Sequence, residues 1–351
     1  MAYKILILGA SYGALLGTKL LMAGHNVTLV CRSSTADLIN AEGTELRLKL
    51  KGETEHRAIF SNDLPGHLDA IPPQDVALEG YDMVVLGMAE PQYAAPEIRA
   101  LLGRIALAGL PCLSLMNMPP LPYLRRIPAL ATAALEDSFT DASVWTGFKP
   151  GAVTLCSPDP QAFRLPNEKS NVLVVGLPTN FKAARFETEA HNTILTTLAH
   201  DIDAVRLDGQ DVPVKLRVYD SLFVPFAKWA MLLTGNYRCV QAQSVQSIRD
   251  AVHGDLEESA AIYAQVDRVV TALGAADGDA VPFEKYSRAA EGLLKPSSVA
   301  RAIDGGVRDI ERVDMLVQSI ADGLGLSDPN FDMIVAAVSA RIEANRRANA
   351  A

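Results

Sequence analysis

Apolar and amphipathic segments alternate along the first third of the chain. Four short runs are mostly or wholly apolar, which is typical of strands that are buried on both faces. These runs are residues 5–8, 27–31, 81–87 and 111–115. Helical stretches follow the first run, up to residue 23, and the third, over residues 92–107. Strands that alternate with helices in this way predict a parallel, doubly wound sheet of the Rossmann type.

The pattern changes twice in the rest of the chain. Residues 140–215 contain strand-like runs between Pro- and Asn-rich loops, which predicts an inserted antiparallel segment over about 120–215. From residue 217 onward nearly every segment has helical periodicity. We therefore expect an α/β Rossmann-type domain over residues 1–215, followed by an all-α C-terminal domain over residues 216–351. A two-domain chain of this kind predicts an active site in the cleft between the domains.

Composition narrows the class of protein. A chain of 351 residues can form two domains, each with its own core. The net charge of −9 and the lack of a basic stripe argue against a nucleic-acid partner. No apolar run is long enough to span a membrane, and residues 3–8 predict a strand in place of a signal peptide. The four cysteines are widely spaced, which predicts no metal site and a reducing, cytoplasmic location.

The first strand runs directly into a turn that contains two glycines. Gly9 and Gly13 flank Ser11 and Tyr12, and a helix follows. Such a turn lets the backbone approach a pyrophosphate, whose charge the helix N-terminus favours. The spacing departs from the usual dinucleotide fingerprint, so an ordinary strand–helix turn is the alternative. The place of the turn in a βαβ unit favours a dinucleotide, which we expect all four residues to contact.

The end of the second strand indicates which dinucleotide is bound. Arg32 and Ser33 stand where an NAD site carries a carboxylate for the ribose 2′-hydroxyl. A cation and a hydroxyl suit a 2′-phosphate, which favours NADP(H); a solvated arginine at a strand end is the alternative. Ligands of such sheets bind beyond the carboxyl ends of the strands. We therefore expect Gly87, Met88 and Asn117 to face the cofactor as well.

Lys228 lies in the most apolar segment of the second half. Residues 222–233 carry no other charge. A lysine without water in such surroundings has a lowered pKa and suits proton donation to a carbonyl oxygen. The alternative is a lysine whose stem covers the helix while its ammonium group stays in water. Asn236 follows two helical turns later on the same face, within reach of the same ligand.

A second group of polar residues follows a proline at position 296. Ser297 and Ser298 stand at an expected helix N-terminus, where a hydroxyl and backbone N–H groups can hold a carboxylate. Glu311 is expected in a helix with Arg308 three residues before it, where it can orient a substrate. The alternatives are a structural helix cap for the serines and a solvated ion pair for Glu311.

Together these residues resemble the pattern of the ketopantoate reductase family over nearly the whole length of the chain. The resemblance rests on the glycine turn, the strand end at Asn117, the pair Lys228 and Asn236, and the Lys-Pro-Ser-Ser segment before Glu311. It implies that NADPH reduces a 2-oxo acid to a 2-hydroxy acid. It also implies that Lys228 is the general acid, that Asn117 contacts cofactor and substrate, and that Glu311 orients substrate and lysine. By the same resemblance Ser297 or Ser298, with Asn236, holds the substrate carboxylate.

The chain also departs from the family pattern. The family's asparagine four residues after the catalytic lysine is Leu232 here, and its lysine after the fourth strand has no counterpart in residues 87–92. An apolar pocket around Leu232, Trp229 and Tyr237 is therefore expected, and with it a bulkier or less polar oxo compound than ketopantoate.

Two alternatives to this function remain at the level of sequence. An opine-type dehydrogenase has a similar two-domain plan but uses a His–Asp pair, and none of the histidines here falls in the matched segments. A dinucleotide-binding sensor without catalysis would explain the missing asparagine and lysine. Apolar helix faces in the C-terminal half are compatible with a homodimer.

Overall fold

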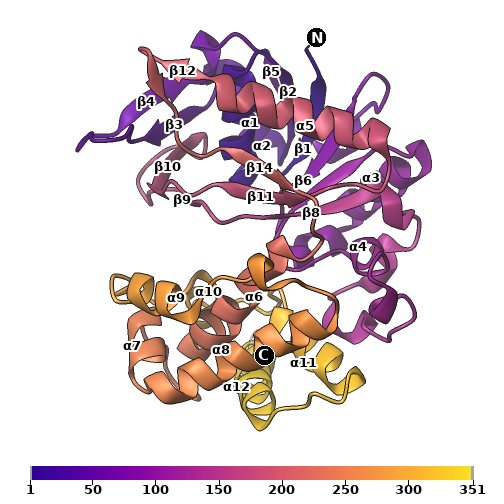
Figure 1. Cartoon of the computed structure of the whole chain (residues 1–351). Coiled ribbons are helices and arrows are strands. Elements are labelled where there is room, and N and C mark those ends of the chain that lie inside the picture. Colours follow the sequence, from indigo (N-terminus) through magenta and orange to yellow (C-terminus); the bar gives the residue numbers. More distant parts are fainter. Residues whose placement is uncertain (1, 349–351) are drawn as a thin grey trace. The chain divides into compact units, whose positions relative to one another are not determined.

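The computed structural model describes residues 2–348. The chain divides into two compact units, which are drawn together in Figure 1. Unit 1 consists of the described residues up to Leu124 and of Ser143–Leu222. Unit 2 consists of Arg125–Ala142 and the described residues from Phe223 onward. The chain thus enters unit 2 briefly, returns to unit 1, and leaves it at Leu222, after the boundary expected at residue 215.

Unit 1 is built on an eight-stranded sheet of order β14-β11-β8-β7-β6-β1-β2-β5. Its strands are β1 (Lys4–Leu8), β2 (Asn26–Val30), β5 (Leu68–Ile71), β6 (Met83–Leu86), β7 (Cys112–Leu115), β8 (Val153–Ser157), β11 (Phe181–Ala184) and β14 (Leu216–Tyr219). From β5 to β8 all neighbours are parallel, whereas β11 is antiparallel to β8 and parallel to β14. The Rossmann-type doubly wound sheet predicted from the alternating pattern is therefore present.

Both faces of the central strands of the sheet are buried, because helices cover them. Ile5 and Ile7 belong to a core that also contains Leu15 of α1 and Leu198 of α5, while Leu6 and Leu8 on the opposite face are equally inaccessible. The helices of unit 1 are α1 (Tyr12–Met22), α2 (Ser33–Glu42), α3 (Pro96–Ala108), α4 (Leu121–Leu124) and α5 (Glu189–Ala204). Burial on both faces explains why these strands are apolar throughout.

The strand order reverses beside β1, which has β2 on one side and β6 on the other. This reversal is the topological switch point of the sheet. In open α/β sheets ligands bind in the crevice beyond the carboxyl ends of the strands at such a point. The glycine turn after β1 and Gly87 after β6 therefore lie at the expected binding crevice.

The segment between residues 120 and 215 differs from the antiparallel insertion that we expected. Its strand β8 extends the main sheet in parallel with β7, and β10 (Val172–Leu177) pairs in parallel with β3 (Glu45–Leu48) of a second sheet. That sheet has the order β4-β3-β10-β9, with β4 (Arg57–Phe60) and β9 (Gln161–Phe163) antiparallel to their neighbours. Residues 144–147, one of the strand-like runs of the sequence, form no strand, and a 3₁₀ turn covers Ala142–Trp145. The strand pair β12 (Arg206–Leu207) and β13 (Gln210–Asp211) completes the unit.

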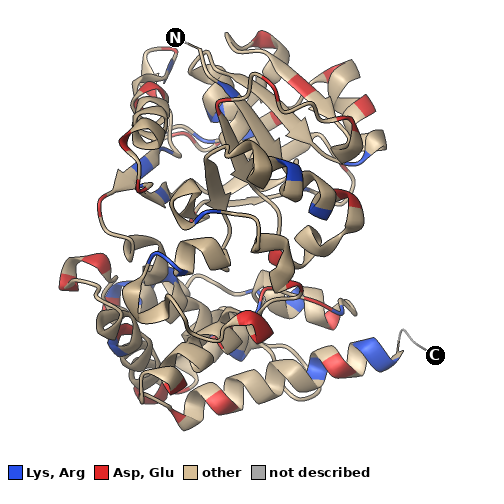
Figure 2. Cartoon of the chain, turned by 90° about the vertical axis from the view of Figure 1, so that its right-hand side faces the viewer, with Lys and Arg blue, Asp and Glu red and all other residues tan. Residues whose placement is uncertain are grey.

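Unit 2 is helical, as expected for the C-terminal part. Its helices are α6 (Ala227–Met231), α7 (Ile248–His253), α8 (Leu256–Ala272), α9 (Phe283–Ala290), α10 (Ser298–Asp304), α11 (Val313–Gly323) and α12 (Pro329–Ala348). No helix within residues 2–348 is long and apolar enough to cross a membrane. Lys and Arg residues are interspersed with Asp and Glu along the ribbons of both units (Figure 2).

Candidate functional site

The glycine turn after β1 has a backbone that only glycine adopts readily. Gly9 has φ +103°, and a β-carbon there would lie 2.7 Å from the carbonyl oxygen of Gly87 and 2.8 Å from Cγ of Met88. Gly13 has a different role, since a β-carbon there would lie 2.5 Å from Cγ2 of Ile7. Gly9 thus lets the backbone after β1 lie close to the end of β6, and Gly13 lets α1 pack against β1.

The N-terminus of α1 lies at the same crevice, and no acidic side chain of its first turn neutralises it. Ser11 is its N-cap residue and is exposed, but its side chain makes no capping hydrogen bond, and the first turn contains no acidic residue. Tyr12 follows and is half-buried. A helix start without an acidic side chain suits a phosphate group, because its N–H groups and dipole carry partial positive charge.

Strands β6 and β7 are buried along their whole length, and residues that follow them are partly exposed. Gly87 and Met88 after β6, and Asn117 after β7, are half-exposed, although the strands before them are fully buried. The N–H of Met88 donates a hydrogen bond to the hydroxyl of Tyr93 at 3.1 Å, which fixes the backbone at this edge. The residues present in unit 1 therefore fit a dinucleotide: a glycine cradle, an uncapped helix start, and exposed groups at three neighbouring strand ends.

Arg32 and Ser33 lie at the carboxyl end of β2 and are exposed. Arg32 has an extended backbone and precedes the first turn of α2, which contains no acidic residue. The site therefore lacks a carboxylate at the position where an NAD site needs one for the 2′-hydroxyl.

In unit 2, a π-helical turn over Leu232–Asn236 follows α6 directly. In a regular α-helix of about 100° per residue, the eight residues from Lys228 to Asn236 would leave the two side chains roughly 80° apart. A π turn, bonded five residues back, advances only about 80° per residue. The π turn therefore brings Asn236 round to the face of Lys228, and both side chains are half-exposed.

Two neighbours make the π turn fit its surroundings. The hydroxyl of Tyr286 on α9 donates a hydrogen bond to the carbonyl oxygen of Met231, at the start of the turn, at 3.2 Å. A β-carbon on Gly235 would lie 2.0 Å from the same hydroxyl oxygen. Gly235 thus lets a tyrosine approach the backbone where the regular helical ladder is interrupted.

The two adjacent serines have different environments. Ser297 is buried, accepts a hydrogen bond from the N–H of Ala300 at 3.1 Å as the N-cap of α10, and donates one to the carbonyl oxygen of Asn236 at 2.7 Å. Its hydroxyl proton is therefore already in use. Ser298 is exposed at the first residue of α10. Ser297 fixes the end of the π turn to α10, and Ser298 is better placed to meet a ligand.

Glu311 does not lie in a helix, which corrects the expectation of a helical pair with Arg308. It is half-exposed in a non-helical segment before α11, and its carbonyl oxygen accepts a hydrogen bond from the Tyr237 hydroxyl at 2.6 Å. The same hydroxyl accepts one from the N–H of Val313 at 3.1 Å. Gly305 and Gly306 end the preceding helix, which explains the missing turn. Tyr237, which follows Asn236, thus connects Glu311 to the π turn.

The apolar side chains expected around a substrate pocket belong to the core. Trp229, Leu232 and Tyr237 are at most 3% exposed, and the Trp229 ring stacks on Phe226 at 4.0 Å. Burial and the nearby charges of Asp314 and Glu311 raise the pKa of Tyr237 well above its usual value, so its hydroxyl stays protonated. The apolar pocket expected around these three side chains is therefore not formed by them, and Leu232 offers no hydrogen-bonding group at the position of the missing asparagine.

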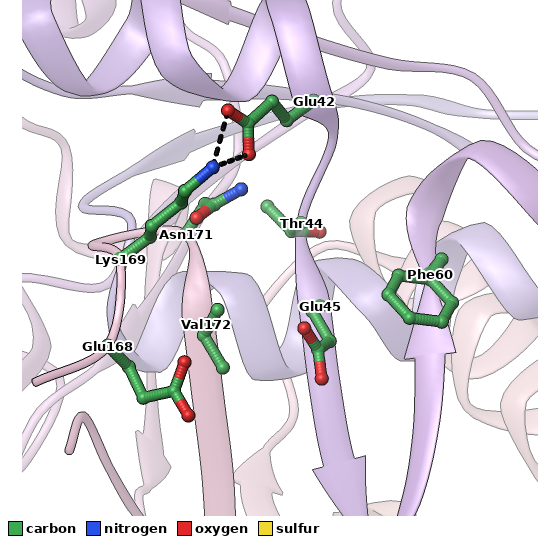
Figure 3. Close-up of a pocket in the computed structure, with 8 residues that line it drawn as sticks. All are labelled: Glu42, Thr44, Glu45, Phe60, Glu168, Lys169, Asn171 and Val172. Carbon is green, nitrogen blue, oxygen red and sulfur yellow. Dashed lines mark hydrogen bonds and ion pairs between the residues drawn. The ribbon is translucent and has the colours of Figure 1, made fainter.

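A hollow of about 270 Å³ in unit 1 does not compete with this site. It lies beside β3 and β10 of the second sheet (Figure 3), and Lys169 and Glu42 form an ion pair of 2.7 Å across it. The Asn171 amide nitrogen also donates to the carbonyl oxygen of Gly43, so much of the lining is engaged within the protein. Within residues 2–348, no group of three or more His, Cys, Asp or Glu side chains is arranged to hold a metal ion.

Comparison with solved structures identifies the fold, although no protein-family model and no curated protein sequence matches the chain. A structure described as a ketopantoate reductase, from Ralstonia solanacearum MolK2, superposes with a TM-score of 0.72 at 14% identity, over 98% of this chain and 99% of that one. A 2-dehydropantoate 2-reductase structure from Bacillus subtilis gives 0.64 at 16%, over 96% and 99%. D-mandelate dehydrogenase, in a ternary structure with NADH and anilino(oxo)acetate, gives 0.64 at 14%, over 98% and 99%. The chain therefore has the fold that ketopantoate reductases and D-mandelate dehydrogenase share.

Proposed function

We propose that the protein is a divergent member of the ketopantoate reductase family that reduces a 2-oxo acid, or a related small carbonyl compound, with NADPH. The observation that carries this proposal is the π turn, which brings Lys228 and Asn236 onto one helix face in a chain of this fold. A proton donor and a neutral hydrogen-bonding amide on one face are what the reduction of a carbonyl group beside a carboxylate requires.

Unit 1 binds the cofactor in this proposal. Gly9, Ser11, Tyr12 and Gly13 hold the pyrophosphate, and Gly87, Met88 and Asn117 face the nicotinamide half. Arg32 and Ser33 hold the 2′-phosphate. These roles are supported by the glycine turn, by the absence of acid in the first turns of α1 and α2, and by the half-exposed residues after β6 and β7. When bound, the dinucleotide supplies the hydride for the carbonyl carbon.

Unit 2 supplies the acid and the substrate anchors. Lys228 donates a proton to the carbonyl oxygen as that oxygen gains negative charge. Asn236 and Ser298 hold the substrate carboxylate, while Ser297 keeps the π turn and α10 together. Glu311 orients substrate and lysine, and the hydrogen bond from Tyr237 to its carbonyl oxygen limits its movement.

The substrate class follows from Leu232. Where the family pattern has a second asparagine after the lysine, this chain offers only a buried apolar side chain. A substrate hydroxyl or amide at that position would lose a hydrogen bond, whereas an apolar group would not. We therefore favour 2-oxo acids with an apolar or aromatic substituent, and the neighbour that was solved with anilino(oxo)acetate makes aromatic oxo acids the first to test.

The test is NADPH oxidation, followed by its absorbance, against a panel of aliphatic and aromatic 2-oxo acids and simple ketones. NADH is the control for the cofactor, and ketopantoate is the control for the substrate. We expect faster turnover with NADPH and with an apolar 2-oxo acid than with ketopantoate. Binding of NADPH without turnover of any compound on the panel would instead favour a sensor.

Lys228→Ala tests the acid directly. Because a positioned general acid contributes roughly 10²- to 10⁴-fold, kcat should fall by about that factor while the affinity for NADPH stays nearly unchanged. The control is Lys285→Ala, which removes an exposed lysine of α9. Equal activity of Lys228→Ala and the control would contradict the assignment.

The opine-type alternative finds less support in the structure. Of the six histidines, only His253 lies in the described part of unit 2, and its Nε2 contacts the carbonyl oxygen of Ser287 at 3.0 Å. No His–Asp pair is therefore available within the described residues of the helical unit. An amine-dependent increase in NADPH oxidation would reverse this preference.

A further inference from the structure

Arg164 reaches the glycine turn from a distant part of the chain. It directly follows β9, at the edge of the second sheet, and its Nη2 donates a hydrogen bond to the carbonyl oxygen of Ala10 at 2.7 Å. The two residues are 154 positions apart in the sequence. The hairpin that carries Arg164 thus places a guanidinium group beside the turn that we assign to the pyrophosphate.

Arg164 is also close to the end of β2. Burial and then the neighbouring positive charge of Arg32 lower the pKa of the Arg164 guanidinium, while Cys31 acts in the opposite direction. Two guanidinium groups, from β2 and from the β9 hairpin, therefore lie near one another at the carboxyl edge of the main sheet. Like charges repel, so their proximity costs free energy unless an anion lies between them.

Among the residues that the structure describes, no carboxylate neutralises this pair. Within residues 2–348, neither Arg32 nor Arg164 forms an ion pair, and the first turns of α1 and α2 contain no acidic residue. Arginines on the adjacent sheet differ: Arg47 pairs with Glu45 and Glu168, and Arg57 pairs with Glu53 and Asp208. Arg32 and Arg164 thus differ from these two arginines, whose charges are neutralised by carboxylates.

We propose that Arg164 is a second ligand of the cofactor 2′-phosphate, which it holds together with Arg32. The inference rests on the proposed function, because it concerns the cofactor of the same site. A phosphate dianion accepts charge-assisted hydrogen bonds from two guanidinium groups at once, whereas a ribose 2′-hydroxyl gains little from a second cation. In this proposal the β9 hairpin adds to the preference for NADPH over NADH that Arg32 provides.

The experiment measures nucleotide binding by calorimetry, without any carbonyl substrate. The probes are adenosine 2′,5′-bisphosphate, which carries the 2′-phosphate, and adenosine 5′-monophosphate, which lacks it. In Arg164→Met the affinity for the bisphosphate should fall about 10- to 100-fold, as expected for one charge-assisted hydrogen bond, and the affinity for the monophosphate should change less than about twofold. Arg164→Lys should retain part of the difference, and Arg47→Met, an ion-paired arginine of the second sheet, should bind like the wild type.

The outcomes separate this inference from the proposed reaction. Equal loss of both probes in Arg164→Met would show that the arginine only shapes the glycine turn, or binds the pyrophosphate, and would overturn the proposal. Unchanged binding of both probes would overturn it as well. If wild-type protein binds the bisphosphate selectively but reduces no carbonyl compound, the reaction fails and the role of Arg164 stands.

Discussion

At the scale of single residues, the partners of a side chain decide between a structural and a functional role. Ser297 and Ser298 are identical in the sequence pattern, and both were candidates for the substrate carboxylate. The structure shows that the hydroxyl of Ser297 both accepts from Ala300 and donates to the carbonyl of Asn236, while Ser298 is exposed. The helix cap that was the alternative for this pair therefore applies to Ser297.

Alanine substitutions of the two serines should affect different properties, stability for Ser297 and substrate binding for Ser298. Ser297→Ala removes a helix cap and a buried hydrogen bond, so the free energy of unfolding should fall by about 1–2 kcal/mol. Ser298→Ala should leave stability nearly unchanged and raise KM for the oxo acid about tenfold, with kcat little affected. Thermal unfolding and steady-state kinetics on both variants check this. The same loss of stability in the two variants would contradict the distinction.

At the scale of elements, the buried strands could be predicted from the sequence, whereas one long helix could not. Apolar runs such as residues 5–8 predict buried strands because both faces of the sheet are covered. The helix α5 was missed because its threonines have low helix propensity; Thr193 and Thr197 instead bond to carbonyls four residues before them.

The candidate site shows the same division. The glycine turn and the terminal Arg32 are local signals, so their place in the fold follows from the sequence. The partner of the turn, Arg164, is far away in the chain and comes from a hairpin whose pairing depends on a second sheet. The π turn depends on a tyrosine of another helix. Neither contact leaves a local pattern, and only the tertiary structure reveals them.

The π turn itself can be tested through Tyr286. In Tyr286→Phe the carbonyl oxygen of Met231 loses a donor, so stability should fall by about 1 kcal/mol, and the register of Asn236 against Lys228 should relax. We therefore expect kcat to fall severalfold in addition. Tyr263→Phe is the matched control, because its buried hydroxyl donates to the carbonyl oxygen of Val281 at 2.7 Å, outside the π turn.

The two variants should thus lose similar stability but differ in turnover. Thermal unfolding and kcat, measured side by side, give the answer. If Tyr263→Phe lowered kcat as much as Tyr286→Phe, the π turn would have no special part in placing Asn236.

At the scale of the whole molecule, a buried lysine joins the beginning and the end of unit 1. Lys19 of α1 is fully buried, and its Nζ donates to the carbonyl oxygens of Pro213 at 3.0 Å and Val212 at 3.5 Å, just before β14. Burial, and then the charge of Lys215, lower the pKa of Lys19 to about 7, although Asp211 opposes the shift. The first helix of the chain is thus held against the segment that leads into the last strand of the sheet.

The lowered pKa of Lys19 makes the stability of unit 1 depend on pH. Below pH 7 Lys19 is protonated in both the folded and the unfolded chain, so it does not make the free energy of unfolding change with pH. Between pH 7 and the ordinary lysine pKa of 10.5, the unfolded chain keeps a proton that the folded chain has released. The unfolded state then binds more protons, and the free energy of unfolding should rise with pH, by at most about 1.4 kcal/mol per pH unit.

The measurement compares wild-type protein with Lys19→Met in urea between pH 7 and pH 9. The two tryptophans allow unit 1 to be followed alone, because Trp145 lies in unit 1 and Trp229 in unit 2. In a Trp229→Phe background, fluorescence reports unit 1, and the wild-type curve should rise more steeply with pH than the Lys19→Met curve. Lys169→Met, at an exposed ion pair, should follow the wild type. Parallel curves for wild type and Lys19→Met would mean that Lys19 keeps its proton when buried, so that the carbonyl contacts alone hold α1 to β14.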